Sequence, residues 1–287
     1  MDIKTIIKLA LKEDTPKGDI TTNALIPKNK IISARFIAKE NGVICGLDIA
    51  KAVFQQLDKK IEFVKKTKDG QFVKNGRVVA EVKGKARAIL TAERTALNFL
   101  QHLSGIATFT KKYVDQAGNN SKIYDTRKTT PLLRDLEKYA VRCGGGYNHR
   151  LNLSDMVLIK DNHLKTIKND TKCHPDENQG LEMLNQVQHD MIKNLFGKKK
   201  VEIEAQSFRQ VKNFLELNPY IIMLDNMDFE LMKKCVNYIR EHSKCEIEVS
   251  GNVNLKTVKK IASLKPDRIS VGKITHSAPA LDISLEF

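Results

Sequence analysis

From residue 122 onward, short apolar runs typical of strands alternate with amphipathic patterns typical of helices. The strand-like runs are KIYDT, MVLI, VEIE, YIIML, IEVS and RISV. The helical patterns between them include SFRQVKNFLEL, DFELMKKCVNYIREH and NLKTVKKIASL. Because repeated strand–helix units pair their strands in parallel, this part of the chain is predicted to fold as an α/β domain around a parallel sheet.

Nearly every one of these strands ends on polar residues. The polar ends are Asp125-Thr126-Arg127, Lys160-Asp161, Glu204, Asp225-Asn226, Ser250-Gly251 and Gly272-Lys273. A (β/α) barrel gathers the carboxyl ends of its strands into one site, whereas an open doubly wound sheet gathers them only where the strand order reverses. The polar strand ends therefore favour a barrel with its site at that edge.

The first part of the chain follows a different pattern. Residues 3–11, 47–57 and 87–103 each place apolar residues at helical spacing. Within residues 31–84, the sequence predicts that ISARFIA meets VICG across Glu40-Asn41-Gly42, and that IEFVKK and RVVAEV lie either side of turn dipeptides. We therefore expect an antiparallel α+β unit ahead of the parallel one.

Cations are concentrated between residues 125 and 163. They are Arg127, Lys128, Arg134, Arg142, His149, Arg150, Lys160 and His163, and they lie beside threonines and a Gly144-Gly145-Gly146 run. Arginine offers planar pairs of donors to carboxylates and phosphates, and lysine offers a point charge. A solvated basic helix is the competing interpretation. Several of the cations follow strand-like runs, which favours a pocket for a small, heavily anionic ligand.

Two acidic residues, Glu204 and Asp225, follow one another at successive strand ends. Carboxylates placed in this way can hold Mg²⁺ and the ribose hydroxyls of a polyphosphate substrate. Glu202 shares a face with Glu204, but the position of Glu204 at the strand end favours Glu204. Ser250-Gly251-Asn252 is predicted to open a helix, and Gly272-Lys273 follows the last strand, so both are candidate phosphate sites.

The net charge of +15 raises the possibility of nucleic-acid binding. The lysines are spread along the chain without a recognition motif, so we expect no nucleic-acid partner. No apolar run approaches the roughly 20 residues that cross a membrane, and the first residues do not read as a signal peptide, which predicts a cytoplasmic protein without membrane contact. The five cysteines include no C-x-x-C pair, so neither a disulfide framework nor a zinc ribbon is expected.

Three motifs, DTRKTTP, LEKYAVRCGGGYNHR and LIKDNH, occur in this order and resemble the signature of the quinolinate phosphoribosyltransferases, also called carboxylating nicotinate-nucleotide pyrophosphorylases. The resemblance implies an incomplete (β/α) barrel with an N-terminal α/β sandwich domain. It places the sandwich domain in residues 1–105, joined by residues 277–287, and the barrel in residues 106–276. Residues 164–200 replace a short helix of the family, and we interpret them as a surface insertion.

The resemblance also implies an activity. Enzymes of this family transfer phosphoribosyl from phosphoribosyl pyrophosphate to quinolinate with decarboxylation, which gives nicotinate mononucleotide, CO₂ and pyrophosphate for NAD biosynthesis. ERTALNFLQHLSGIAT resembles a further family motif, whose arginine, here Arg94, reaches the active site of the partner subunit and so implies a homodimer. The implied catalytic residues are Lys160, Glu204 and Asp225, with Glu204 and Asp225 as Mg²⁺ ligands together with substrate phosphates.

The other implied site residues bind the two substrates. Those for the acceptor and the ribose are Arg94, Thr126, Arg127, Lys128, His149, Arg150, Lys160, Glu204 and Asp225. Those for the 5-phosphate are Ser250, Gly251, Asn252, Gly272, Lys273 and His276. A related enzyme with another acceptor, such as a nicotinate phosphoribosyltransferase or the pyrophosphorylase-like protein of molybdenum operons, stays open.

The sequence departs from the family pattern at a few positions without losing a charged site residue. Leu132 stands where DTRKTTP is usually followed by Gly, and Lys273-Ile274 replaces Ala-Leu after Gly272. Asn152 and Ser154 replace a Gly and an aromatic residue after the His-Arg pair. We expect these changes to alter loop packing and to leave the activity in place.

Overall fold

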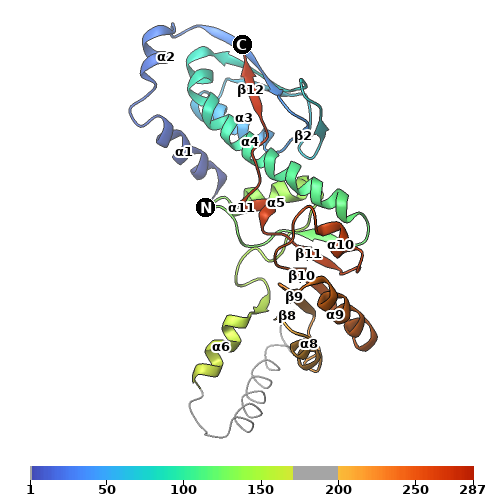
Figure 1. Cartoon of the computed structure of the whole chain (residues 1–287). Coiled ribbons are helices and arrows are strands. Elements are labelled where there is room, and N and C mark those ends of the chain that lie inside the picture. Colours follow the sequence, from blue (N-terminus) through green and yellow to red (C-terminus); the bar gives the residue numbers. More distant parts are fainter. Residues whose placement is uncertain (1, 171–199) are drawn as a thin grey trace. The chain divides into compact units, whose positions relative to one another are not determined.

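The computed structural model describes residues 2–170 and 200–287 (Figure 1). It divides into two compact units. The first comprises the chain up to Asp115 together with Lys128–Asn148 and Gly272–Phe287, and the second comprises Gln116–Arg127 and His149–Val271. Of the surface insertion expected at 164–200, residues 171–199 lie outside the described part, so that expectation stays a prediction.

A four-stranded antiparallel sheet organises the first unit, in the order β12-β1-β5-β3. Its strands are β1 (Ile31–Ala38), β3 (Glu62–Lys65), β5 (Val78–Lys85) and β12 (Ile283–Glu286). The pairing of β3 with β5 joins the predicted IEFVKK and RVVAEV strands. Three aromatic rings, Phe36, Phe54 and Phe63, pack in the core with centroids 5.7–6.1 Å apart.

The expected meeting of ISARFIA with VICG is wrong. β2 (Gly42–Val43) pairs with β4 (Phe72–Val73) in a separate two-stranded sheet. A strand has only two edges, and those of β1 are taken by β5 and by β12 from the end of the chain. β2 instead runs tightly against α4, where the Val43 N–H donates to Thr108 Oγ1 at 2.8 Å. The partners of β1 therefore come from segments distant in the sequence, which a local turn pattern cannot predict.

Six helices belong to this unit. They are α1 (Ile3–Asp14), α2 (Ile20–Leu25), α3 (Leu47–Leu57), α4 (Ala86–Ala117), α5 (Arg134–Cys143) and α11 (Lys273–His276). The predicted helix at 87–103 continues through Ser104-Gly105, a pair that reads as a helix end. A Cβ on Gly105 would lie 2.1 Å from the Pro279 carbonyl oxygen, so this glycine serves close packing inside the helix. No helix within the described residues is long and apolar enough to cross a membrane.

The second unit is a six-stranded parallel sheet in the order β6-β11-β10-β9-β8-β7. Its strands are β6 (Lys122–Tyr124), β7 (Val157–Ile159), β8 (Val201–Ala205), β9 (Ile221–Asp225), β10 (Glu246–Ser250) and β11 (Arg268–Ser270). All the strands predicted from residue 122 onward are confirmed. From β7 to β11 each strand neighbours the next in sequence, as in a (β/α) barrel, while β6 and β7 form the two ends of the sheet. The barrel is therefore incomplete, as predicted.

The helices of this unit lie between the strands along the chain. They are α6 (Asp161–Asp170), α8 (Phe208–Leu215), α9 (Phe229–His242) and α10 (Val258–Ala262). Side-chain caps begin two of them: Ser207 accepts the N–H of Gln210, and Asp228 accepts the N–H of Leu231. Because every strand runs in the same direction, all carboxyl ends meet at one edge of the sheet.

Leu132, which stands where the family usually has Gly, adopts a backbone conformation that is unfavourable for a residue with a side chain. Its φ is 69°, a left-handed conformation that costs side-chain-bearing residues about 1–2 kcal/mol, and its side chain is 67% exposed. We expect Leu132→Gly to raise the free energy of unfolding by about 1 kcal/mol, since relief of strain outweighs the added flexibility of the unfolded chain. Urea denaturation measures this.

The matched control is Leu153→Gly. Leu153 is 69% exposed, and its φ is not positive. There the added flexibility of glycine should lower stability. Equal losses at both positions would show that Leu132 carries no strain.

Candidate functional site

The carboxyl edge of the parallel sheet brings together predicted site residues from five strands. They are Thr126 and Arg127 after β6, Lys160 after β7, Glu204 in β8, Asp225 at the end of β9 and Ser250 at the end of β10. β8 and β9 are direct neighbours in register, and so are β9 and β10. The expectation that strand ends collect functional groups thus holds for these residues.

Lys160 and Glu204 form an ion pair at this edge. Lys160 Nζ lies 3.3 Å from Glu204 Oε2, and Gln206 Nε2 donates to Glu204 Oε1 at 3.3 Å. The Lys160 side chain is 46% exposed, whereas that of Glu204 is 6% exposed. An exposed cation on a buried carboxylate can turn to an incoming anion at little cost in packing. Sequence reasoning did not single out Gln206.

Asp225 is held by a small polar network that sequence reasoning also missed. Asn226 Nδ2 donates to Asp225 Oδ2 at 2.6 Å, and Asn252 Nδ2 donates to Asn226 Oδ1 at 3.2 Å. The Asn226 N–H donates to the Ser250 carbonyl oxygen at 3.1 Å. The turns after β9 and β10 are therefore fixed to each other.

The expectation that Ser250-Gly251-Asn252 opens a helix is wrong, because α10 begins only at Val258. Gly251 and Asn252 adopt left-handed φ values of 88° and 52° and make a tight turn instead. The local sequence has the glycine and asparagine typical of such a turn. A phosphate at this position would meet turn N–H groups and not a helix terminus.

Gly251 makes this turn possible. A Cβ there would lie 2.3 Å from Asn226 Oδ1 and 2.6 Å from the Asn226 backbone nitrogen. We expect Gly251→Ala to raise the KM for the phosphate-bearing substrate that the family resemblance implies about tenfold or more and to lower stability by about 1–3 kcal/mol, because the turn must open. Steady-state kinetics and urea denaturation measure the two effects.

Gly76→Ala is the matched control. Gly76 has a φ of 81°, and a Cβ added there would have nothing within 4 Å. The alanine variant therefore has the same backbone strain as Gly251→Ala but no steric clash. Its KM should stay near that of the wild type. A normal KM in Gly251→Ala as well would remove this turn from substrate binding.

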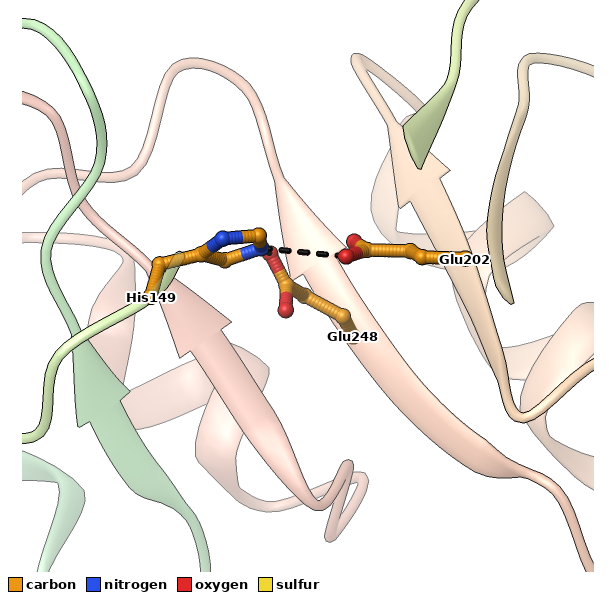
Figure 2. Close-up of side chains that lie close together, drawn as sticks. All are labelled: His149, Glu202 and Glu248. Carbon is orange, nitrogen blue, oxygen red and sulfur yellow. Dashed lines mark ion pairs between the residues drawn. The ribbon is translucent and has the colours of Figure 1, made fainter. Parts of the chain in front are cut away.

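His149, Glu202 and Glu248 form a buried cluster inside the second unit (Figure 2). His149 Nε2 lies 3.1 Å from Glu202 Oε2 and 3.6 Å from Glu248 Oε1. The Arg150 backbone N–H donates to His149 Nδ1 at 2.8 Å, and the His149 N–H donates to Asp125 Oδ1 at 2.8 Å. A ring nitrogen that accepts carries no proton, so the proton of the neutral imidazole sits on Nε2, facing the carboxylates.

Burial controls the charge of the two glutamates. It raises the pKa of Glu202 to about 7. It also raises the pKa of Glu248 to about 8, and the neighbouring charge of Glu202 adds to this rise. Burial thus favours the protonated forms of both glutamates, which limits the buried negative charge.

Sequence reasoning passed over Glu202 and did not mention Glu248. The available signal was an acidic residue inside each apolar strand, in VEIE and IEVS. Within residues 2–170 and 200–287, His149, Glu202 and Glu248 are also the one group of three potential ligands close enough together to hold a metal ion.

Arg127 and Arg150 lie near enough to influence each other. Burial lowers the pKa of Arg150, and the charge of Arg127 lowers it further. Arg150 Nη1 donates to the Met156 carbonyl oxygen at 3.0 Å, which orients the guanidinium. Two arginines that repel one another in a half-buried setting are stabilised by an anion between them.

The remaining predicted residues belong to the first unit. Arg94 is exposed on α4. Lys128, Gly272 and His276 lie together: a Cβ on Gly272 would be 3.1 Å from Lys128 Cδ and 3.3 Å from His276 Cδ2. Thr275 Oγ1 donates to the Lys128 carbonyl oxygen at 2.8 Å. Lys273 begins α11 and is exposed.

Comparisons with known proteins agree over the whole chain. Residues 19–104 match the family model for the quinolinate phosphoribosyl transferase N-terminal domain, and residues 106–286 match that for the C-terminal domain. The chain is 40% identical to the chloroplastic carboxylating nicotinate-nucleotide pyrophosphorylase of Oryza sativa, over 99% of this chain and 77% of that protein. It is 41% identical to the probable carboxylating enzyme of Synechocystis, over 96% and 89%.

A solved structure of similar sequence also has the same fold. The nicotinate-nucleotide pyrophosphorylase of Ehrlichia chaffeensis superposes with a TM-score of 0.86 at 36% identity, covering 100% of this chain and 98% of that one.

Proposed function

Because this chain belongs to the quinolinate phosphoribosyl transferase family, we propose that its parallel sheet carries out the family reaction. The chain transfers the phosphoribosyl group of phosphoribosyl pyrophosphate to quinolinate and releases CO₂ and pyrophosphate. The product, nicotinate mononucleotide, feeds NAD biosynthesis. The observation that carries this proposal is the sheet edge where paired arginines and Lys160 lie with the two carboxylates of Glu204 and Asp225.

The cations suit an acceptor with two carboxylates. Arg127 and Arg150 offer bidentate donors to one carboxylate, and Lys160 leaves its ion pair with Glu204 to meet the other. Nicotinate carries one carboxylate and would leave part of this positive charge unmatched. The charge arrangement therefore favours quinolinate over nicotinate.

The carboxylates suit the sugar-phosphate donor. Glu204, the last residue but one of β8, and Asp225, the last residue of the neighbouring β9, can accept hydrogen bonds from ribose hydroxyls. Mg²⁺ takes one or two protein carboxylates together with substrate phosphates, so Glu204 and Asp225 would hold it with the pyrophosphate of the donor. When bound, the ion neutralises the charge of the pyrophosphate.

Catalysis by these residues is positioning and charge stabilisation. The pyridine nitrogen attacks C1 of the ribose as pyrophosphate leaves, through an oxocarbenium-like transition state that the carboxylates stabilise. The ring becomes cationic on ribosylation. This positive charge stabilises the carbanion left at C2 when the 2-carboxylate departs as CO₂, and C2 then takes up a proton from water to give nicotinate mononucleotide. The cations that bind the 3-carboxylate hold the ring in place. No covalent nucleophile is needed.

The other roles stay predictions from the family resemblance. Thr126 and His149 are assigned to substrate binding, and Ser250, Gly251 and Asn252 to the 5-phosphate. In the first unit, Lys128 is assigned to substrate binding, and Gly272, Lys273 and His276 to the 5-phosphate. Arg94 acts in the partner subunit of a homodimer, and its exposure on α4 is compatible with this. A cytoplasmic location is likewise a prediction.

The acceptor is tested by assaying the purified protein with phosphoribosyl pyrophosphate and Mg²⁺ against quinolinate or nicotinate. Chromatography quantifies nicotinate mononucleotide, which both acceptors would yield. We expect kcat/KM for quinolinate to exceed that for nicotinate by at least about 100-fold, since nicotinate lacks one of the two carboxylates that these cations would bind. The reverse preference would keep the donor assignment and overturn the acceptor.

A further inference from the structure

We propose that Glu202, Glu248 and His149 are positioning residues that hold Arg150 in place for a quinolinate carboxylate. This inference rests on the proposed function and adds roles for two glutamates deep in the sheet. It also changes the role of His149 from binding substrate to fixing the residue that follows it.

One nitrogen of the His149 ring accepts a backbone N–H, and the other is buried against the two carboxyl groups. Nδ1 accepts the backbone N–H of Arg150 at 2.8 Å, and Nε2 faces Glu202 at 3.1 Å. The residue is only 8% exposed. Nε2 is buried, so a substrate carboxylate does not reach it. In this arrangement its direct effect is on the Arg150 backbone.

The two glutamates make this arrangement rigid. Glu202 lies on β8 and Glu248 on β10, the strands on either side of β9, and each is 0% exposed. Figure 2 shows the ring edge turned toward both carboxyl groups. Side chains from paired strand interiors have little freedom to move, so the imidazole is held from two directions.

The backbone at 149–150 is fixed at both ends. The His149 N–H donates to Asp125, a residue that is 0% exposed and lies two positions before Arg127. The Arg150 N–H donates into the His149 ring. The cluster therefore sets where Arg150 stands relative to Arg127. A displacement of about 1 Å at such a donor pair weakens a bidentate contact strongly.

The test uses Glu248, since Glu202 lies two residues from Glu204 and its replacement would disturb donor binding. Isothermal titration of quinolinate into the full-length protein gives the Kd for Glu248→Leu, Glu248→Gln, Arg150→Ala and the Glu248→Leu/Arg150→Ala double variant. We expect Glu248→Leu to weaken quinolinate binding at least about tenfold. Glu248→Gln should stay within about threefold, because the amide keeps the size, shape and polarity of the group beside the imidazole.

The double variant separates positioning from general structure. If Glu248 acts through Arg150, adding Glu248→Leu to Arg150→Ala should weaken binding by no more than about twofold. Additive losses would overturn the proposal, as would equal losses in Glu248→Gln and Glu248→Leu. A wild-type protein that fails to bind quinolinate would instead refute the proposed function itself.

Two controls complete the experiment. Glu246→Gln, on the same strand but paired with Arg268, should leave the Kd unchanged. Elemental analysis of the wild-type protein after EDTA treatment should find no stoichiometric metal. One equivalent of metal, lost in Glu248→Gln, would show that the three side chains are ligands and would overturn the positioning role.

Discussion

Replacing Lys160 with alanine lowers kcat by about 10²- to 10³-fold without unfolding the protein, if this residue stabilises charge in the transition state. Lys160 Nζ is 3.3 Å from Glu204 Oε2, so one flexible cation contacts the carboxylate proposed to bind the donor. Its side chain is 46% exposed, and its loss therefore creates no cavity. Steady-state kinetics with quinolinate and thermal unfolding measure the two outcomes.

The matched control is Lys233→Ala, an exposed lysine on α9 that is not among the proposed site residues. It removes the same charge from the same unit and should leave kcat within about twofold of the wild type, as for an ordinary surface substitution. Near-normal kcat in Lys160→Ala would end its catalytic assignment. A large fall in thermal stability would mean that its ion pair with Glu204 is mainly structural.

The second large effect concerns Arg94. Arg94→Ala should lose activity by about 10²-fold or more, because a bidentate contact to a substrate carboxylate disappears. Co-expressing Arg94→Ala with Lys160→Ala under two affinity tags should restore about a quarter of the wild-type activity. Random pairing makes half of the dimers mixed, and one site in each mixed dimer then has both residues intact.

The control pairs Lys160→Ala with Arg150→Ala, two residues assigned to the same subunit's site. Each site of that mixed dimer lacks one of them, so no activity should return. Failure of the Arg94 and Lys160 pair to complement, in a protein shown to be dimeric, would contradict the contribution across the interface. Activity in Arg94→Ala alone would remove the residue from the site.

Local patterns were enough to predict the parallel unit. The six strands after residue 122 and the polar residues that end them follow from short-range periodicity, and the sheet order confirms them. The family predicted from DTRKTTP, LEKYAVRCGGGYNHR and LIKDNH is confirmed by two family models that together span residues 19–286 with a one-residue gap. Polar residues at strand ends could be predicted from the sequence because each strand and the residues that end it lie in one short segment.

Features that depend on distant segments were missed. β1 pairs with β12, about 250 residues away, and no local turn could indicate this. Ser104-Gly105 reads as a helix end, yet α4 continues because the chain near Pro279 packs onto it. Glu202 and Glu248 become a cluster only when β8 and β10 flank β9 and bring His149 between them.

The measurement that tests the central claim most directly follows carbon from labelled quinolinate. Protein supplied with phosphoribosyl pyrophosphate, Mg²⁺ and quinolinate labelled with ¹⁴C in the 2-carboxylate should release ¹⁴CO₂ in equal amount to the nicotinate mononucleotide formed. Label placed in the 3-carboxylate should stay in the nucleotide. Nucleotide formed without release of label from the 2-carboxylate, or a folded protein that leaves both labelled substrates unchanged, would contradict the account.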